Sequence, residues 1–304
     1  MAIIGVGVIL PTVAVQHAEG LDLPGAARHA EDLGFDSVWH GDHLAIGRPT
    51  LDCAVALAAA AAATRRIRIG ASVFVPAMRP LAWAAKQIAS LQHVSGGRLI
   101  LGIGSGGGPT QWAAAGVTYA ARGRRTDTAL ELLPRLLAGE PVQLPDEPDQ
   151  PVVQLAPAVS RPPFWVGNAS PVAIRRAARY GDGWFPSLVP AGELADAASR
   201  LRERASARLR PTPSIAIGAA GAIGSGSGTP TREEIAAQVS RAYGMPYERA
   251  ATIPITGTPQ EAAERLAAYQ RAGARHLVMG FSGGAWRQQC ELLAHARSLL
   301  DDAP

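Results

Sequence analysis

The chain has 304 residues, of which 47% are hydrophobic and 18% are charged, an ordinary globular composition. The net charge of +4 is small and aromatic residues make up only 5%, so the composition does not favour a nucleic-acid-binding protein, which usually carries clustered Lys and Arg. The first apolar run stops at Pro11 without the charged start of a signal peptide, and the Ala-rich run over 51–63 is too short to cross a bilayer. These features predict a protein with neither a nucleic-acid nor a membrane partner.

Two cysteines, Cys53 and Cys290, lie far apart in apolar surroundings. Their spacing matches neither a disulfide framework nor a metal site, which fits a reducing compartment. We therefore expect a cytoplasmic protein without a bound metal.

In chain order, continuous apolar runs alternate with amphipathic stretches. This alternation is typical of a parallel sheet covered by helices. The apolar runs predict eight strands, over residues 3–10, 37–40, 67–74, 98–103, 164–166, 183–186, 214–219 and 276–280. The amphipathic stretches predict helices over 23–33, 51–64, 80–94, 126–137, 171–180, 191–209, 232–243, 259–272 and 286–300. The Pro-rich segment 139–163 is predicted to be a loop or a short irregular ribbon.

Eight strand–helix units over about 300 residues predict a (β/α)8 barrel of the TIM type, formed by a single domain over residues 1–304. A doubly wound open sheet is the alternative, because one miscounted strand would hide the difference. In a barrel the carboxyl ends of the strands surround one mouth, where the active sites of this fold lie.

The run "RLILGIGSGGGP" includes the fourth strand and has the spacing G-x-G-x-x-G from Gly102 to Gly107. A dinucleotide fingerprint belongs on the first βα turn of its unit and leads directly into a helix. Three βα units come first here, and we expect "GPTQWAAAGVTY" to delay the next helix, so we reject that interpretation. Two remain: the glycines relieve crowding at the strand end, or Gly104, Ser105 and Gly106 let backbone amides approach a ligand.

The predicted strand ends bring together side chains that are polar but carry little charge. Asp42 and His43 are adjacent after the second strand, but two such residues alone make no metal site. Such a rim suits an organic cofactor that carries the chemistry itself. The other candidates at the rim are Ser72, Val73, Ser105, Gly106, Asn168, Ala169 and Ser170.

The segment "FWVGNASPVAIRRAARYGDGWFP" joins a short strand to a helix that begins after Ser170. Serine followed by Pro171 is typical of a helix N-terminus. Such an end offers free amides to a phosphate, unless Ser170 only caps the helix. The "GDGW" that follows predicts a tight turn and a buried Trp184.

Six stretches along the chain form a further pattern: "AEDLGFDSVWHGDHL", "RIRIGASVFVPAMRP", "QIASLQHVSGGRLILGIGSG", "RGRRTD", "PPFWVGNASPVAIRRAARYGDGWFP" and "ITGTPQEAAERLAAYQRAGARHLVM". In this order they resemble the bacterial-luciferase-like superfamily along nearly the whole chain. The resemblance is closest to oxidoreductases that use the deazaflavin coenzyme F420, whereas relatives with nearly the same motifs use FMN. It implies a TIM-type barrel with a flavin or deazaflavin at its mouth.

The resemblance also implies where the cofactor lies. The family has a non-proline cis peptide at the end of the third strand, which supports the cofactor ring, and Ser72–Val73 occupies that place here. The "GNAS" of this chain replaces the usual Gly-Gly in one phosphate-binding turn. The family's phosphate contacts match Ser105 and Gly106 after the fourth strand, and Asn168, Ala169 and Ser170 after the fifth.

The Asp-His pair of the family matches Asp42 and His43, which are the catalytic candidates. The resemblance implies that such a histidine accepts a proton in the sugar-phosphate dehydrogenases of the superfamily, although a loop histidine can also be purely structural. The glutamate of those dehydrogenases falls at Gly107 and is absent, which argues against their particular reaction.

The leading hypothesis is an oxidoreductase that transfers a hydride between coenzyme F420 and a small organic substrate. The alternatives are an FMN-dependent monooxygenase of the same family and, from a different class, a barrel that binds a flavin without turnover. Family members are often dimers, so we expect a homodimer. Arg122 and Arg125 either meet a phosphate or substrate carboxylate or remain solvated, and Trp112 either lines a substrate pocket or only packs.

Overall fold

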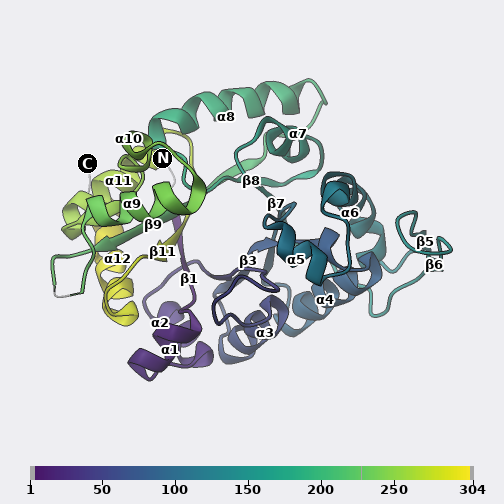
Figure 1. Ribbon diagram of the computed structural model, residues 1–304, viewed down its shortest axis with the longest axis horizontal. Coiled ribbons are helices and arrows are strands. Elements are labelled where there is room, and N and C mark those ends of the chain that lie inside the picture. The colour runs from purple at the N-terminus through teal and green to yellow at the C-terminus, as the bar shows by residue number, and fades with distance from the viewer. Residues whose placement is uncertain (1–3, 227, 302–304) are drawn as a thin grey trace.

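A closed ring of parallel strands forms the centre of the protein (Figure 1). The structure is a computed structural model and describes residues 4–226 and 228–301. The pairings of β8 with β9 and of β11 with β1 complete the ring. Its strands are β1 (Gly5–Ile9), β2 (Ser37–His40), β3 (Arg68–Phe74), β4 (Leu99–Ile103), β7 (Phe164–Gly167), β8 (Gly183–Phe185), β9 (Ser214–Ile223) and β11 (His276–Phe281).

The ring confirms the predicted (β/α)8 barrel. The doubly wound alternative is wrong, because an open sheet has two unpaired edges whereas here every ring strand has a neighbour on both sides. A further strand, β10 (Ile255–Gly257), pairs in parallel with the end of β9. Outside the ring, β5 (Val142–Gln143) and β6 (Val152–Val153) form a small antiparallel ribbon in the Pro-rich segment.

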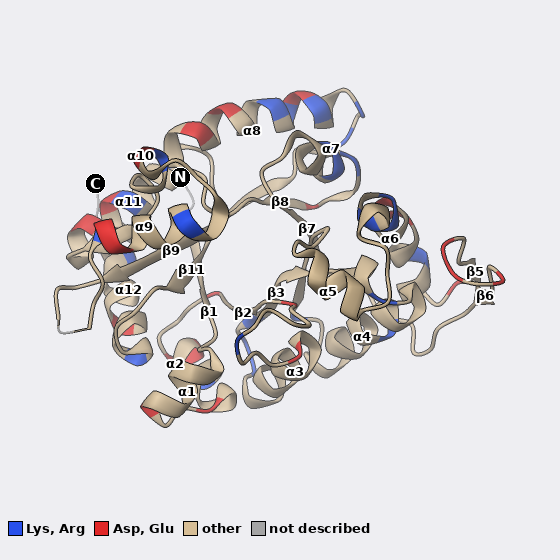
Figure 2. Ribbon diagram, in the orientation of Figure 1, with Lys and Arg blue, Asp and Glu red and all other residues tan. Residues whose placement is uncertain are grey.

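Helices surround the ring, and most Lys, Arg, Asp and Glu residues belong to them (Figure 2). Arg68 is the only Lys, Arg, Asp or Glu in the eight ring strands, as expected for strands covered on both faces. The longer helices are α2 (Leu23–Asp32), α3 (Cys53–Ala63), α4 (Leu81–Val94), α6 (Arg122–Leu137), α7 (Pro171–Tyr180), α8 (Ala191–Ser206), α9 (Arg232–Tyr243), α11 (Pro259–Arg271) and α12 (Trp286–Asp301). Shorter elements are α1 (Val13–Glu19), α5 (Pro109–Ala114), α10 (Tyr247–Ala250), and the 3-10 turns η1 (Pro76–Met78) and η2 (Tyr119–Ala121).

Side-chain caps fix where several helices begin. Thr231 and Thr258 each accept a hydrogen bond from the backbone of a glutamate three residues on, and that glutamate bonds back to the cap. These reciprocal capping boxes satisfy amides that the first turn of a helix otherwise leaves free. They start α9 and α11 at the residues where the sequence predicts them.

Aromatic side chains fill the interior of the ring. Trp39 stacks on Trp165, with ring centroids 5.4 Å apart, and Phe185 packs against both. The indole of Trp39 donates to Ser37 Oγ (2.7 Å), which also bonds to Nε2 of His276 (2.8 Å). The interior of the barrel is therefore a packed core, and active sites of this fold lie at the carboxyl ends of the strands.

Several boundaries differ from those predicted. Residue 3, where the first predicted strand begins, lies outside the described residues. The expectation that no helix follows the glycines promptly is wrong, because α5 begins at Pro109, directly after Gly108. Helix α6 starts four residues earlier than predicted, and α1 and α10 were not predicted. Within the described residues, no helix is long and apolar enough to cross a bilayer.

Candidate active site

Strand β3 ends at an uncommon backbone step. The peptide bond between Ser72 and Val73 is cis, as the sequence resemblance predicts, and the β3–β4 register shifts around it. The hydroxyl oxygen of Ser72 is buried and has no hydrogen-bond partner in the described part of the chain. Because buried hydroxyls are normally paired, this oxygen is available to a bound molecule.

The side chain of Val73 lies among three glycines from neighbouring strand ends. A Cβ built at Gly104 would overlap Cγ2 of Val73, and one at Gly167 would lie 2.8 Å from Cγ1. At Gly102 a Cβ would overlap the carbonyl oxygen of Ala71 and lie 3.1 Å from Cγ1 of Val73. Gly102 and Gly104 therefore make room inside the barrel, which supports the crowding interpretation for these two positions.

The glycine turn after β4 packs against α5. Gly106 has a φ of 61°, the left-handed conformation that favours glycine. A Cβ there would lie 3.0 Å from Cγ1 of Val75 and 3.3 Å from Nε1 of Trp112. Trp112 is fully buried, so it packs rather than lining an open pocket. The neighbouring Gln111 accepts a hydrogen bond from the backbone N–H of Leu44 (3.0 Å), which ties α5 to the loop after β2.

His43 lies beside the end of β3. A Cβ built at Gly41 would be 3.0 Å from Nε2 of His43 and 3.7 Å from the carbonyl oxygen of Ser72, so the imidazole and the Ser72 backbone flank the same point. Part of the ring stays exposed to solvent. The surrounding loop desolvates it enough to lower the pKa of His43, and the positive charge of Arg48 lowers it further. His43 is therefore neutral near pH 7 and able to accept a proton.

The side chain of Asp42 is buried, and both of its carboxylate oxygens accept hydrogen bonds. Its carboxylate accepts hydrogen bonds from the backbone N–H of Val75 (2.8 Å) and from Nη2 of Arg79 (2.7 and 2.8 Å). The guanidinium of Arg79 also stacks over the ring of Phe74, 4.5 Å from its centroid. Asp42 thus holds the segment that directly follows the cis bond.

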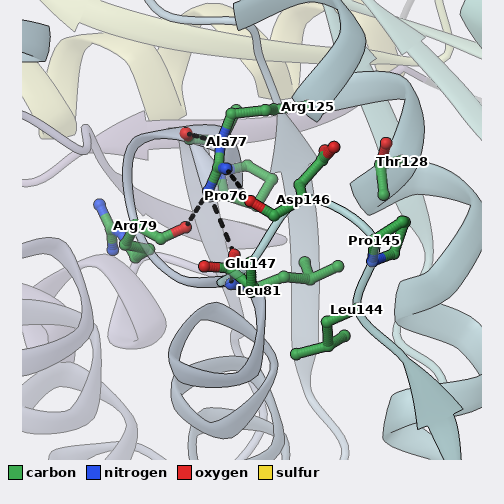
Figure 3. A pocket seen from close by; sticks show the side chains of 10 residues that line it. All are labelled: Pro76, Ala77, Arg79, Leu81, Arg125, Thr128, Leu144, Pro145, Asp146 and Glu147. Atoms are coloured by element: carbon green, nitrogen blue, oxygen red, sulfur yellow. Dashed lines mark hydrogen bonds and ion pairs between the residues drawn. The ribbon is translucent and has the colours of Figure 1, made fainter. Parts of the chain in front are cut away.

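Arg125 also binds the segment that follows β3 (Figure 3). It donates to the carbonyl oxygens of Ala77 (3.1 Å), Arg79 (3.2 Å) and Asp146 (3.3 Å), and it pairs with Glu147 at 3.3 Å. The adjoining pocket has a volume of about 10 Å³, roughly the size of one water molecule, so it cannot hold an organic cofactor. The structure therefore gives Arg125 a structural role.

Arg122 also interacts locally. Its guanidinium lies 4.0 Å from the ring centroid of Tyr119 and donates to the Tyr119 carbonyl oxygen (3.1 Å). This contact joins the first residue of α6 to the turn before it.

A buried arginine that the sequence analysis missed lies behind Ser105. Nη1 of Arg176 donates to Ser105 Oγ (2.8 Å), while Nε and Nη2 donate to the Asp127 carboxylate. No signal in "AIRRAARY" distinguishes this arginine from its neighbours, because the amphipathic pattern only shows that α7 has a buried face. Its position on α7 brings it against Ser105 and α6.

The turn after β7 leaves three residues exposed. Asn168 has a φ of 81°, a conformation that glycine adopts freely and that asparagine tolerates best among the other residues. "GNAS" can therefore replace Gly-Gly without a change of backbone shape. Asn168 Oδ1 accepts from the N–H of Ser170 (2.8 Å), and Ser170 caps α7 by accepting from Ala173 N (3.3 Å). Trp184 is buried, as predicted, and donates to the carbonyl oxygen of Asn168 (2.9 Å).

The predicted site residues lie on adjacent strand ends. Ile103 of β4 is paired with Val166 of β7, so the turn at Ser105 and the turn at Asn168 leave the ring side by side. β4 also pairs with β3, which carries Ser72 and Val73. The structure thus collects the predicted residues on one arc of the mouth, formed by β2, β3, β4 and β7.

Comparison with known proteins gives the family. The sequence model of the luciferase-like monooxygenase family matches residues 7–252. The chain is 37% identical over 141 residues to an uncharacterised protein of Mycobacterium tuberculosis, covering 46% of this chain and 49% of that protein. It spans about half the length of the first curated relatives it matches. A longer alignment, with the F420-dependent glucose-6-phosphate dehydrogenase of Beutenbergia cavernae, has 32% identity over 297 residues and covers 82% and 84% of the two chains.

Solved structures share the fold at low sequence identity. An F420-dependent secondary alcohol dehydrogenase, solved with an F420-acetone adduct, aligns with a TM-score of 0.79 and 17% identity over 97% of this chain and 98% of that one. The oxygenating constituent of 3,6-diketocamphane monooxygenase from Pseudomonas putida, solved with FMN, aligns with a TM-score of 0.74 and 17% identity over 96% and 97%. The family match over residues 7–252 and the long alignment at 32% identity show that the chain belongs to the luciferase-like monooxygenase family.

Proposed function

We propose that this chain is an oxidoreductase that transfers a hydride between coenzyme F420 and a small organic substrate. The family match, the F420-dependent relative along four-fifths of the chain and the fold shared with an F420-dependent alcohol dehydrogenase support the proposal. The observation that carries it is the cis bond between Ser72 and Val73, at the strand end where the family resemblance expects support for a cofactor ring.

The residues at the mouth fit such a cofactor. Ser72 offers a buried hydroxyl that has no hydrogen-bond partner among the described residues, and the turn at Asn168 is exposed beside the start of a ten-residue helix. When bound, the deazaflavin supplies the ring carbon that accepts or gives the hydride. The residues that we propose for the ring are Ser72 and Val73, and those for the phosphate are Ser105, Gly106, Asn168, Ala169 and Ser170.

On the protein side, His43 exchanges the proton that accompanies hydride transfer. Its lowered pKa keeps the imidazole neutral at pH 7, which is the form a general base needs. Asp42 has its carboxylate bound to Val75 and Arg79, so in this proposal it positions the cofactor-side segment rather than exchanging protons.

A second candidate is an FMN-dependent monooxygenase. The FMN-bound structural neighbour supports it, as does a 4-hydroxyprotoasukamycin monooxygenase of Streptomyces nodosus that is 36% identical over 163 residues, or 51% of this chain. Titrating the purified protein with F420 and with FMN separates the two candidates. We expect F420 to bind and FMN to bind weakly. If FMN binds tightly and the reduced FMN complex consumes oxygen, the protein is a monooxygenase and our proposal is wrong.

Turnover is tested by following F420 absorbance with a panel of alcohols, aldehydes, ketones and activated alkenes. His43→Gln should lower kcat by about 10²–10⁴-fold and leave cofactor affinity unchanged. His93→Gln, at an exposed position of α4, is the matched control. Tight cofactor binding without turnover of any substrate by the unmodified protein would instead indicate a flavin-binding barrel.

The remaining expectations extend this proposal. We propose a small-molecule substrate, a homodimer in solution and a cytoplasmic location. Light scattering at several protein concentrations measures the oligomeric state, and cell fractionation tests the location.

A further inference from the structure

Arg176 connects three parts of the molecule behind the proposed phosphate site. Its residue surface is only 8% exposed, although arginine is rarely buried without a partner. Four hydrogen bonds account for its burial: two to the carboxylate of Asp127, one to the carbonyl oxygen of Gly123 (2.8 Å) and one to Ser105 Oγ (2.8 Å). The guanidinium therefore links α7, α6 and the turn after β4 in a fixed geometry.

The bond to Ser105 decides which way that hydroxyl points. A guanidinium has no acceptor, so Ser105 Oγ must accept from Arg176 and its own hydrogen must point elsewhere. This bond is the one that the Ser105 side chain makes among the described residues. Ser105 is partly exposed, so its hydrogen is left for a ligand at the mouth.

Asp127 restricts what Arg176 itself can do. The carboxylate pairs with the arginine at 2.6 Å and is about half exposed, so it offsets the positive charge and fills two of the five donors. Arg176 is therefore placed to orient Ser105 rather than to bind an anion as a free charge.

We propose that Arg176 is a positioning residue that makes the Ser105 hydroxyl a hydrogen-bond donor to a phosphate oxygen of the cofactor, and so sets the preference of the site for phosphorylated over phosphate-free flavins. The inference rests on the proposed function, because it takes a flavin or deazaflavin as the ligand. It goes beyond that function by assigning the phosphate preference to a residue that lies behind the site.

The test compares ligands that differ only in the tail. The unmodified protein and Arg176→Leu are titrated at fixed ionic strength with F420 and its phosphate-free chromophore, and with FMN and riboflavin. The unmodified protein should prefer the phosphorylated form of whichever pair it binds. Arg176→Leu should reduce that preference roughly ten- to a hundredfold, the range expected for one hydrogen bond to a charged group, while affinity for the phosphate-free form stays the same.

Two further variants separate positioning from folding and from charge. Arg175→Leu removes the same charge from an exposed position of the same helix, so it should leave the preference unchanged. Ser105→Ala should reproduce the effect of Arg176→Leu, and combining the two should add nothing, because Arg176 acts through Ser105. If Arg176→Leu does not fold, Ser105→Ala alone decides.

Each remaining outcome overturns the inference. If Arg176→Leu lowers the affinity for the phosphorylated and the phosphate-free ligands equally, the role of Arg176 is only structural. An unchanged preference in Ser105→Ala excludes its hydroxyl as the donor. If the unmodified protein binds both forms equally, the inference fails while the proposed function stands. If it binds neither F420 nor FMN, the proposed function fails first.

Discussion

His276, the first residue of β11, should make the protein less stable in mild acid. Its imidazole bonds to Ser37 and packs against Trp165, with ring centroids 5.3 Å apart. Desolvation lowers the pKa of His276 from 6.5 to about 4 in the folded protein. As the pH falls below 6.5, the unfolded chain therefore takes up a proton that the folded chain does not. The free energy of unfolding should fall as the pH goes from about 6.5 to about 4, and should be unaffected by this group above that range.

The size of this loss of stability follows from the shift in the pKa of His276. A difference of 2.5 pH units, from 6.5 to 4, corresponds to about 3 kcal/mol when fully developed, of which about 2 kcal/mol appears between pH 7 and pH 5. The glutamine in His276→Gln does not titrate, but its amide can still bond to Ser37. Between pH 7 and pH 5 the free energy of unfolding of this variant should therefore fall by about 2 kcal/mol less than that of the unmodified protein.

Urea unfolding at pH 7, 6 and 5 measures the free energy of unfolding of the unmodified protein and of His276→Gln. His93→Gln removes an exposed histidine and should keep the slope of the unmodified protein. If the unmodified protein and His276→Gln lose the same free energy of unfolding over this range, then His276 is not kept neutral by its surroundings and the reasoning is refuted.

Two further substitutions test the neighbourhood of the cis bond. Gly104→Ala should lower the free energy of unfolding by about 1–3 kcal/mol, because its Cβ would overlap Val73. Adding Val73→Ala should restore part of this loss. If Gly104→Ala costs the same with Val73 and with Ala at position 73, the glycine does not serve to make room for Val73. Asp42→Asn should lower the free energy of unfolding by about 3 kcal/mol in thermal or urea unfolding, because it removes the buried carboxylate that pairs with the partly buried Arg79. A neutral result would show that the pair does not hold the segment.

The barrel was predictable because most of its strands are short, largely buried and rich in apolar residues. "SVWH" is bounded by helix-ending and loop residues, and the predicted strand over 37–40 has the observed limits. Helix α5 was missed because Gly108 and Pro109 are read as loop residues, and its six residues are too few to show a period. α1 has seven residues and no buried side chain, so it lacks an apolar face to detect.

The candidate site was predictable as a set of strand ends but not as a set of contacts. The G-x-G pattern after β4 is typical of ligand-binding turns, and only the positions of Gly102 and Gly104 around Val73 show that two of the glycines serve packing. Arg176 stands beside Arg175 in the sequence with the same local composition. Which of the two is buried depends on how α7 is rotated against α6, and that is a property of the packed molecule.

In the part of the chain that the structure describes, the packed side chains of Trp39, Trp165 and Phe185 fill the interior of the ring, so active sites of this fold are reached from the carboxyl ends of the strands. In the proposed reaction the cofactor and the substrate both arrive from that side, so the one seated deeper has to arrive first and leave last. Binding order would then be a consequence of architecture, and a kinetic pattern in which either partner can add first would require a second route that these packed side chains do not provide.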